Sequence, residues 1–224
     1  AANPLWGAPR IHGELGKLGI EVSQASVAKY MVRRRQPPSQ TWRTFLQNHL
    51  HQTVAADFFV VPTATGRLLF VLILLAHERR RIVHVGITDH PTALWTTQQL
   101  REAFPWDTAP RFLLHDRDHA FDGVTAVDLH EIRTAPRSPW QNAYVERFIG
   151  SVRRECLDHV IIFHAAGLRR VLETYVVYYM ASRTHLSLEK DPPIPRPVAS
   201  PTAGRVVALA QVGGLHHRYE RRAA

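Results

Sequence analysis

Short apolar runs with little polar interruption occupy the middle of the chain, and turn-forming sequences separate them. The first three are TVAADFFVV (53–61), RLLFVLILLA (67–76) and RIVHVGIT (81–88). Runs of this length, divided by PTATG and by HERR, predict an antiparallel meander of β-strands. A fourth strand is predicted at RFLLHD (111–116) and a short fifth strand at HEIRT (130–134).

Helical periodicity marks three segments that come after the predicted meander. The first, PTALWTTQQLREAF (91–104), begins with a proline, which is favoured in the first turn of a helix. Two longer helices are predicted over 142–158 and 166–182. In the helix over 142–158, apolar residues recur at the spacing of a core-facing stripe: Val145, Phe148, Ile149, Val152 and Cys156. This order indicates an α/β domain over about residues 50–190, with a mixed sheet flanked by helices.

The first 36 residues carry a different, basic helical pattern. Gly19 can end a first helix and Ser23 can cap a second one. In the second helix, the inward positions are Val27, Tyr30 and Met31, and the outward basic positions are Lys29, Arg33, Arg34 and Arg35. This layout predicts a partial helix-turn-helix over 1–36 that binds DNA through the basic side chains. The alternative is a helical pair that only packs on its neighbour and has a solvated basic end. Whether an upstream portion precedes Ala1 stays open.

Segments of a different character flank the predicted α/β domain. Residues 37–49 are predicted to be a linker, because the prolines of RRRQPPSQ (33–40) stop a helix and hold the chain extended. The basic tail, 191–224, has two strand-like runs around Gly213 and Gly214. The tail is either a hairpin that docks on DNA or on a neighbouring subunit, or a segment without fixed structure.

The charge balance narrows the class of partner. With 28 Lys and Arg against 19 Asp and Glu, the net charge is +9 and the pI is about 10.4, which favours a polyanion such as nucleic acid. The single cysteine, Cys156, permits no internal disulfide and suits a reducing compartment, so we expect a cytoplasmic protein. The longest apolar run, LLFVLILLA, has nine residues, well short of the ~20 that a membrane helix needs. No membrane partner is therefore expected.

Three carboxylates stand out from the apolar pattern. Asp57 lies within a strand, where a buried charge costs several kcal/mol unless it is paired or bound to metal. Asp116 ends the fourth strand, at the edge where α/β sheets place ligands, and Asp118 is an alternative two residues later. Glu146 lies beside the apolar stripe of its helix. Taken singly, such residues are more often turn residues, caps or halves of ion pairs. Together they form an oxygen-only set suited to hard divalent cations.

Several motifs resemble one known family. AADFF, LLHDRD and TAPRSPWQNAYVERFIGSVRRECLDH look like the DDE integrase core of bacterial insertion-sequence transposases, which is related to retroviral integrases. The segment SPWQNAYVERFIGSVRREC carries the strongest resemblance, and YYMASRTHLSLEKDPPIPRPV (178–198) is similar to the end of the family's core. The likeness covers most of residues 7–198.

This resemblance implies an RNase H-like fold and a transposase that cuts DNA and transfers strands at the ends of a mobile element. It implies that two Mg²⁺ or Mn²⁺ ions are held by Asp57, Asp116 and Glu146. The expected partner is double-stranded DNA, of both element ends and target, bound by a homo-oligomer on the bacterial nucleoid. Further DNA contacts are predicted at Gln141, Asn142, Arg153 and Arg154.

The chain departs from the family in one interval. Asp116 and Glu146 are 30 positions apart (146 minus 116), and the family usually has several more residues there. The shortening falls in HAFDGVTAVDLHE, where the family has a fuller helix. Two alternatives to an active transposase therefore remain: a catalytically impaired DNA-binding remnant, and a metal-dependent nuclease without strand transfer.

Overall fold

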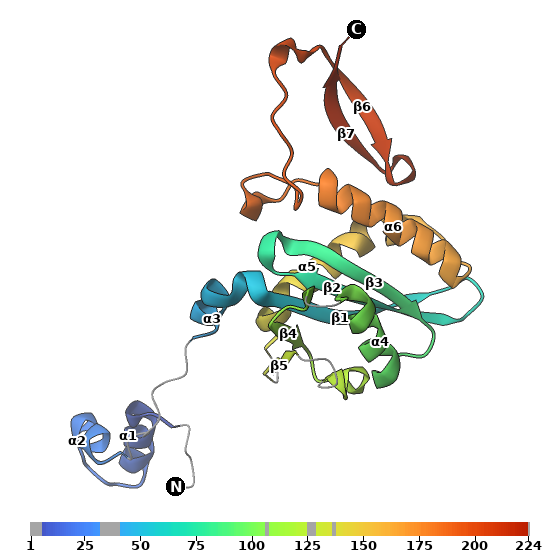
Figure 1. Ribbon diagram of the computed structural model, residues 1–224. Coiled ribbons are helices and arrows are strands. Elements are labelled where there is room, and N and C mark those ends of the chain that lie inside the picture. Colours follow the sequence, from blue (N-terminus) through green and yellow to red (C-terminus); the bar gives the residue numbers. More distant parts are fainter. Residues whose placement is uncertain (1–5, 32–40, 106–107, 125–128, 136–137, 224) are drawn as a thin grey trace. The chain divides into compact units, whose positions relative to one another are not determined.

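The computed structural model describes residues 6–31, 41–105, 108–124, 129–135 and 138–223 (Figure 1). The chain divides into two compact units, Ala1–Thr41 and Trp42–Ala224. Within the described residues, none of the helices is both long and apolar enough to cross a membrane.

The first unit is a pair of short helices, α1 (Ala8–Lys17) and α2 (Gln24–Tyr30). Gly19 follows α1 with φ of 74°, a left-handed conformation that glycine adopts without steric cost. The Ser23 hydroxyl accepts a hydrogen bond from Ser26 N at 3.1 Å and caps α2, as predicted.

One prediction for α2 is wrong. Val27 is buried, but Tyr30 is 80% exposed and does not face inward, because two short helices share only a narrow buried stripe. Of the predicted DNA-binding residues in this unit, Lys29 is described, and Arg33, Arg34 and Arg35 lie outside the described residues.

The second unit is built on a five-stranded mixed sheet. Its strands are β1 (Thr53–Pro62), β2 (Leu68–Ala76), β3 (Arg81–Thr88), β4 (Phe112–His115) and β5 (His130–Arg133). Their order across the sheet is β3-β2-β1-β4-β5. The first three form the predicted antiparallel meander, whereas β4 runs parallel to β1, and β5 runs parallel to β4.

Helices cover both faces of this sheet. Even-numbered residues of β1, such as Val54 and Ala56, pack with the cluster beneath α4 (Ala93–Ala103). Odd-numbered residues, such as Ala55 and Phe59, pack with α5 (Ala143–Glu155) and α6 (Ala165–Ala181). This alternation follows from the two-residue period of a strand buried on both sides. The predicted α/β class, with a mixed sheet flanked by helices, is confirmed.

Single 3₁₀ turns connect many of these elements: η1 (Leu50–Gln52), η2 (Glu78–Arg80), η4 (His119–Phe121), η6 (Pro139–Asn142), η7 (Leu157–His159), η8 (Leu186–Leu188), η9 (Pro201–Ala203) and η10 (Val212–Gly214).

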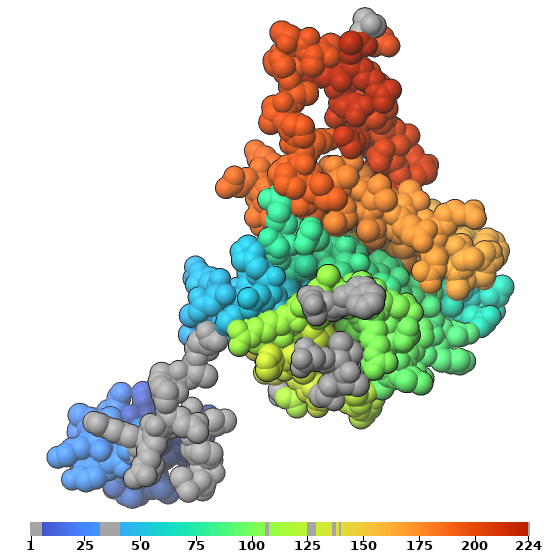
Figure 2. All heavy atoms as spheres, viewed as in Figure 1, coloured from blue at the N-terminus to red at the C-terminus, as the bar shows by residue number. Residues whose placement is uncertain are grey.

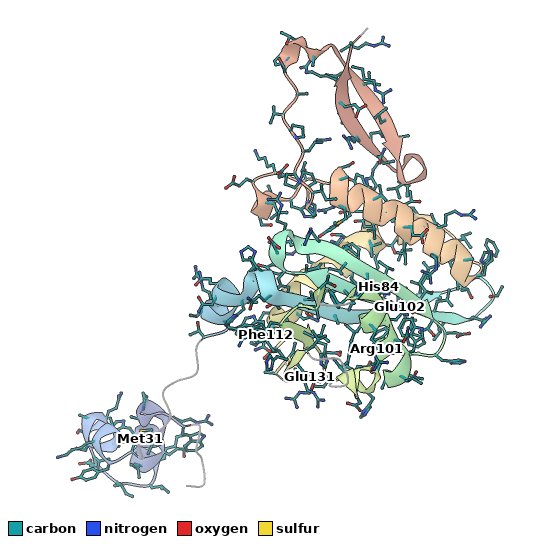
Figure 3. All side chains as sticks on the ribbon, viewed as in Figure 1. Met31, His84, Arg101, Glu102, Phe112 and Glu131 are labelled. Carbon is teal, nitrogen blue, oxygen red and sulfur yellow. The ribbon has the colours of Figure 1, made fainter. Side chains whose placement is uncertain are left out.

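The predicted linker over 37–49 needs correction. Residues 37–40 lie outside the described residues, but Trp42–His49 forms helix α3. Phe45 stacks on Trp42 at 5.4 Å between ring centroids and meets Phe112 of β4 edge-on at 5.2 Å. Phe112 lies at the end of the sheet next to α3 (Figure 3). Because Trp42, Phe45 and His49 recur at helical spacing, this segment has an aromatic stripe that attaches it to the sheet.

The tail forms the hairpin that the sequence left open, with strands β6 (Arg205–Gln211) and β7 (His216–Arg222) (Figure 1). At its base, the His216 ring stacks on Tyr178 of α6 with centroids 4.5 Å apart. His216 Nε2 also donates to the Glu155 carbonyl at 2.8 Å, and Val212 is buried against α6. These contacts attach the base of the hairpin to the ends of α5 and α6.

Candidate active site

Two predicted carboxylates meet where β1 and β4 run in parallel. Val54 pairs with Leu113, and Ala55 pairs with Leu114. Asp57 lies two residues beyond Ala55 in β1, and Asp116 is the first residue after β4, two beyond Leu114. Because side chains alternate along a strand, Asp57 lies on the face that carries Ala55 and α5, and the charge of Asp116 acts on it. The fold therefore brings these two residues together.

The surroundings of Asp57 disfavour its charge. The pKa of Asp57 is raised to about 7, first by burial and then by the negative charge of Asp116. Glu146 and Asp118 raise it further, and a 2.8 Å hydrogen bond from Phe58 N to Asp57 Oδ1 opposes the shift. Several negative charges thus converge on one half-buried carboxylate.

Asp118 has a local structural role that separates it from Asp116. Its Oδ1 accepts a 2.8 Å hydrogen bond from Ala120 N and caps η4. Asp116 Oδ1 accepts from Asp118 N at 3.1 Å, and the Asp116 side chain is exposed. Of the two, Asp116 also has the larger electrostatic effect on the pKa of Asp57. The structure therefore favours Asp116 over Asp118 as the second carboxylate of the site.

Glu146 lies in the first turn of α5, and the residue one turn earlier fixes the start of that helix. Asn142 is only 4% exposed, and its Nδ2 donates to the carbonyl of Ala56, the residue before Asp57, at 3.2 Å. Asn142 is therefore not placed to contact DNA, contrary to prediction, because its buried amide holds α5 against β1. Glu146 itself is exposed.

The other residues near α5 that were predicted to contact DNA differ in whether their side chains already have partners within the protein. Arg153 Nη2 donates to the Val60 carbonyl at 3.0 Å, and its guanidinium lies 5.3 Å from the Phe59 ring centroid. The Arg153 guanidinium therefore already binds β1 within the protein. Gln141 Oε1 accepts from Ala135 N at 2.6 Å and closes the loop before η6. Arg154 is exposed, and its guanidinium lies beside Gly150 on the surface of α5.

Asn142 and Arg153 supply hydrogen-bond donors to backbone carbonyls along one edge of β1. Strand β4 pairs with β1 only as far as Ala55, which leaves the edge of β1 open from Ala56 onward. Asn142 donates to the carbonyl of Ala56, and Arg153 donates to the carbonyl of Val60. Every second carbonyl of a strand points to the same edge, so these two carbonyls share one edge of β1. Side chains of α5 therefore substitute for a neighbouring strand directly beside Asp57.

A buried pair that was not predicted from the sequence, His115 and Glu131, lies next to Asp116. His115 is fully buried, and its Nδ1 donates to the Asp116 carbonyl at 2.5 Å. Its Nε2 lies 2.9 Å from Glu131 Oε1, a distance that suits an ion pair although the angle is poor for a hydrogen bond. Glu131 lies on β5, at the edge of the sheet (Figure 3). A polar residue in the apolar run RFLLHD was the available signal, since buried imidazoles need partners.

The donor set fits a divalent cation in charge and chemistry. All three side chains offer oxygen, and a cation would offset the repulsion that disfavours ionised Asp57. Across the part of the chain that the structure describes, however, no three His, Cys, Asp or Glu side chains are gathered closely enough to hold one ion. Holding an ion at all three carboxylates would require the exposed Glu146 to turn toward the aspartates.

Comparison with known proteins finds similarity to integrase-core and insertion-element proteins. Residues 128–193 match the sequence model of the family described as "Integrase core domain". The chain is also 24% identical over 176 residues to the "Insertion element IS476 uncharacterized 39.2 kDa protein" of Xanthomonas euvesicatoria. That alignment covers 74% of this chain and 51% of the relative, so the chain spans about half the relative's length. The predicted resemblance to integrase-core transposases is confirmed.

Solved structures similar to this chain include integrases and a transposase. A chain of the simian T-cell lymphotropic virus intasome, in complex with PP2A regulatory subunit B56 gamma, is 13% identical, with a TM-score of 0.49 and coverage of 95% of this chain and 86% of that chain. The HTLV-2 integrase catalytic core domain in complex with magnesium (trimeric form) is 10% identical, with a TM-score of 0.46 and coverage of 64% and 93%. The catalytic domain of Mos1 mariner transposase is 12% identical, with a TM-score of 0.47 and coverage of 61% and 77%.

Proposed function

We propose that this chain is the catalytic part of a DDE-type transposase, which cuts double-stranded DNA at the ends of a mobile element and joins those ends to a target. The observation that carries the proposal is the placement of Asp57 within β1 and of Asp116 directly after the neighbouring parallel strand β4, together with the raised pKa of Asp57, to which Asp116 and Glu146 contribute. The integrase core match over residues 128–193, which includes Glu146, supports the same reaction class.

In this proposal, Asp57, Asp116 and Glu146 hold Mg²⁺ or Mn²⁺, two ions in the complete site. When bound, such ions supply positive charge for a displacement at phosphorus. Asn142 positions α5 so that Glu146 starts near the aspartates, and His115 with Glu131 fixes the backbone of Asp116. Substrate recognition is assigned to the helical pair in residues 1–36, and we propose that a homo-oligomer acts on the DNA.

The short interval between Asp116 and Glu146 bears on whether this site is active. Its described part contains the turn η4, strand β5 and the turn η6 before α5, while 125–128 and 136–137 lie outside the described residues. The start of α5 is nevertheless fixed by Asn142 and by the apolar stripe of the helix, which includes Val145 and Phe148. The shortening is therefore compatible with an active arrangement.

A cleavage and joining assay tests the proposal. A duplex that carries the terminal repeats flanking the gene, incubated with Mg²⁺ or Mn²⁺, should be cut at the element end and joined to a second duplex. Asp57→Asn, Asp116→Asn and Glu146→Gln should each abolish both products. Asp118→Asn is the matched control and should retain them, because an asparagine can still cap η4.

Each failure of this assay has a defined meaning. Cutting without a joined product would indicate a metal-dependent nuclease. End-specific binding without any cutting would indicate the impaired DNA-binding remnant. Loss of activity in Asp118→Asn with retention in Asp116→Asn would overturn the assignment of the second carboxylate.

A further inference from the structure

A groove runs between the C-terminal hairpin and the extended segment that follows α6 (Figure 2). Its larger part has a volume of about 1150 Å³, between residues 187–199 and strand β7. A smaller part of about 490 Å³ continues toward the end of α6. Arg196, Arg218 and Tyr219 line both parts, so the two parts are adjacent, and we refer to them together as the groove.

Positive side chains line this groove in excess over carboxylates. The cations are Arg79, Arg183, Lys190, Arg196, Arg218 and Arg221. The carboxylates are Glu155, Glu189, Asp191 and Glu220.

Most of these carboxylates already have a cationic partner. Asp191 pairs with Arg79 at 3.1 Å, and Glu155 pairs with Arg183 at 2.6 Å. Glu220 pairs with Arg222, just outside the groove, at 2.8 Å. These pairs neutralise Arg79 and Arg183, and Arg218 lies 3.6 Å from the Glu220 carboxylate, so the excess positive charge of the groove comes from its other cations.

Three of the cations have no carboxylate partner within the described residues: Lys190, which is exposed, Arg196, which is half-buried, and Arg221, which donates to the carbonyls of Pro201 and Gly204. Arg196 lies where the two parts of the groove meet. A guanidinium in this setting presents several N–H donors in a fixed plane, a geometry that suits phosphate oxygens.

Arg218 adds an independent indication of a missing acceptor. Its Nε is buried without a hydrogen-bond partner, because the nearest carboxylate oxygen, Glu220 Oε2, lies 3.6 Å away. The rest of the side chain is 32% exposed and reaches the groove. Beside it, Tyr219 is 61% exposed and offers a hydroxyl and a flat apolar face.

We propose that this groove binds the phosphate backbone of duplex DNA, as a contact surface separate from the carboxylate site on the sheet. The inference deepens the proposed function, on which the choice of DNA as the polyanion rests. Contacts to phosphates carry no sequence information, so the groove would hold DNA in place and would not select the element's ends.

A charge-matched pair of double variants tests this assignment. Lys190→Gln with Arg196→Gln removes two groove charges that have no ion pair to break. Arg169→Gln with Arg170→Gln removes two exposed charges from the first half of α6, outside the groove. Affinity for a random-sequence duplex of about 30 base pairs is measured by anisotropy against salt concentration, with chelator present so that no cutting occurs.

The groove variant should bind about 10-fold more weakly near ~0.1 M salt, and the slope of log affinity against log salt should fall by about 2. The control variant should stay within about 2-fold of the parent, and neither pair should change the melting temperature. Equal losses in both variants, or no loss in the groove variant, would overturn the proposal. A groove variant that binds DNA normally but changes its oligomeric state in sedimentation would show that the groove holds protein instead.

Failure of this inference is distinguishable from failure of the proposed function. If the parent binds DNA and the groove variant binds equally well, the groove is excluded as a DNA-binding surface, while the proposed transposase function still stands. If the parent binds no duplex at all in chelator or in Mg²⁺, both are rejected.

Discussion

Burial and neighbouring negative charge both disfavour ionisation of Asp57 in the absence of a cation, although the proposed reaction needs the ionised side chain. Its place on β1 puts it among core residues such as Ala55 and Phe59, where ionisation is costly. The nearby Asp116 then adds a negative charge. Metal-free folding therefore works against the ionised side chain that the proposed reaction needs.

We expect Asp57→Asn to stabilise the metal-free protein at pH 8. The folded pKa of about 7 lies above the ordinary value of 3.8, so the folded state binds the proton more tightly than the unfolded state does. That stabilising contribution is complete below pH 3.8 and is lost as the pH rises through 7. The variant should gain on the order of 1–4 kcal/mol at pH 8, and the gain should shrink toward pH 4.

Urea denaturation of both proteins in chelator, over this pH range, measures the effect. Mg²⁺ should then stabilise the parent and leave the variant unchanged. A variant that is less stable than the parent at pH 8 would instead identify Asp57 as a structural partner.

Asn142 should be a structural residue whose loss also disturbs the site. Removing its amide in Asn142→Ala leaves the Ala56 carbonyl without its donor, which should lower the free energy of unfolding by about 1–3 kcal/mol. Gln141→Ala is the matched control, since its bond to Ala135 is exposed and should cost less. Chemical denaturation compares the two, and equal losses would show that the Ala56 contact has no special weight.

At the scale of elements, Glu155 joins two helices and the hairpin through its carboxylate and its backbone carbonyl. Glu155 ends α5, and both of its carboxylate oxygens accept from Arg183, which follows α6. Tyr175 of α6 donates to the same carboxylate at 2.8 Å, and His216 of β7 donates to the Glu155 carbonyl. This single residue therefore connects α5, α6 and the hairpin that borders the groove.

Glu155→Gln should consequently destabilise the second unit by about 1–3 kcal/mol at pH 7. Burial opposes ionisation of Glu155, but hydrogen bonds from Arg183 and Tyr175 outweigh it, so its pKa lies below the ordinary value of 4.5. The stabilisation is therefore present above pH 4.5 and is lost as the pH falls through the lowered folded pKa.

Melting curves of parent and variant should accordingly converge in acid. Glu173→Gln, an exposed carboxylate on α6, should match the parent throughout. A gap between parent and Glu155→Gln that stays constant at all pH values would contradict the ionic origin of the effect.

At the scale of the whole molecule, the chain consists of two units with separate internal packing. Deleting residues 1–41 should leave the melting temperature of the remaining unit unchanged, because its core residues all lie beyond Trp42. The deletion should abolish preference for element ends and leave salt-sensitive binding to any duplex. Competition between end-sequence and random duplexes checks this, and a truncated chain that still discriminates would move recognition to the second unit.

Much of this architecture could be predicted from the sequence because period and composition act locally. The run at 67–76 predicted β2 within one residue, and the stripe through Val145 and Val152 predicted α5. The positions of Asp57 and Asp116 in the sheet followed from the strand assignments. Asp116 and Glu146 both raise the pKa of Asp57, but the metal-holding role of the three carboxylates stays a prediction.

What the sequence did not predict depends on contacts between distant segments. The buried role of Asn142 requires knowing that β4 stops pairing at Ala55 and leaves a carbonyl exposed. The sequence predicts a linker where helix α3 lies, because Phe45 gains its contact with Phe112 only once β4 lies beside it. The pair of His115 and Glu131 likewise exists only because β5 lies next to β4.

The strand order also has a consequence for the time course of folding. Strands β1, β2 and β3 are joined by short turns, whereas Phe112 pairs with Thr53, 59 positions away (112 minus 53). Closing the longer loop costs more entropy, so we expect the meander to form early and β4 to dock late. The two aspartates would then be brought together only after the meander can resist their repulsion. Pulse-labelled hydrogen exchange during refolding should protect β2 amides before β4 amides, and the reverse order would refute this sequence of events.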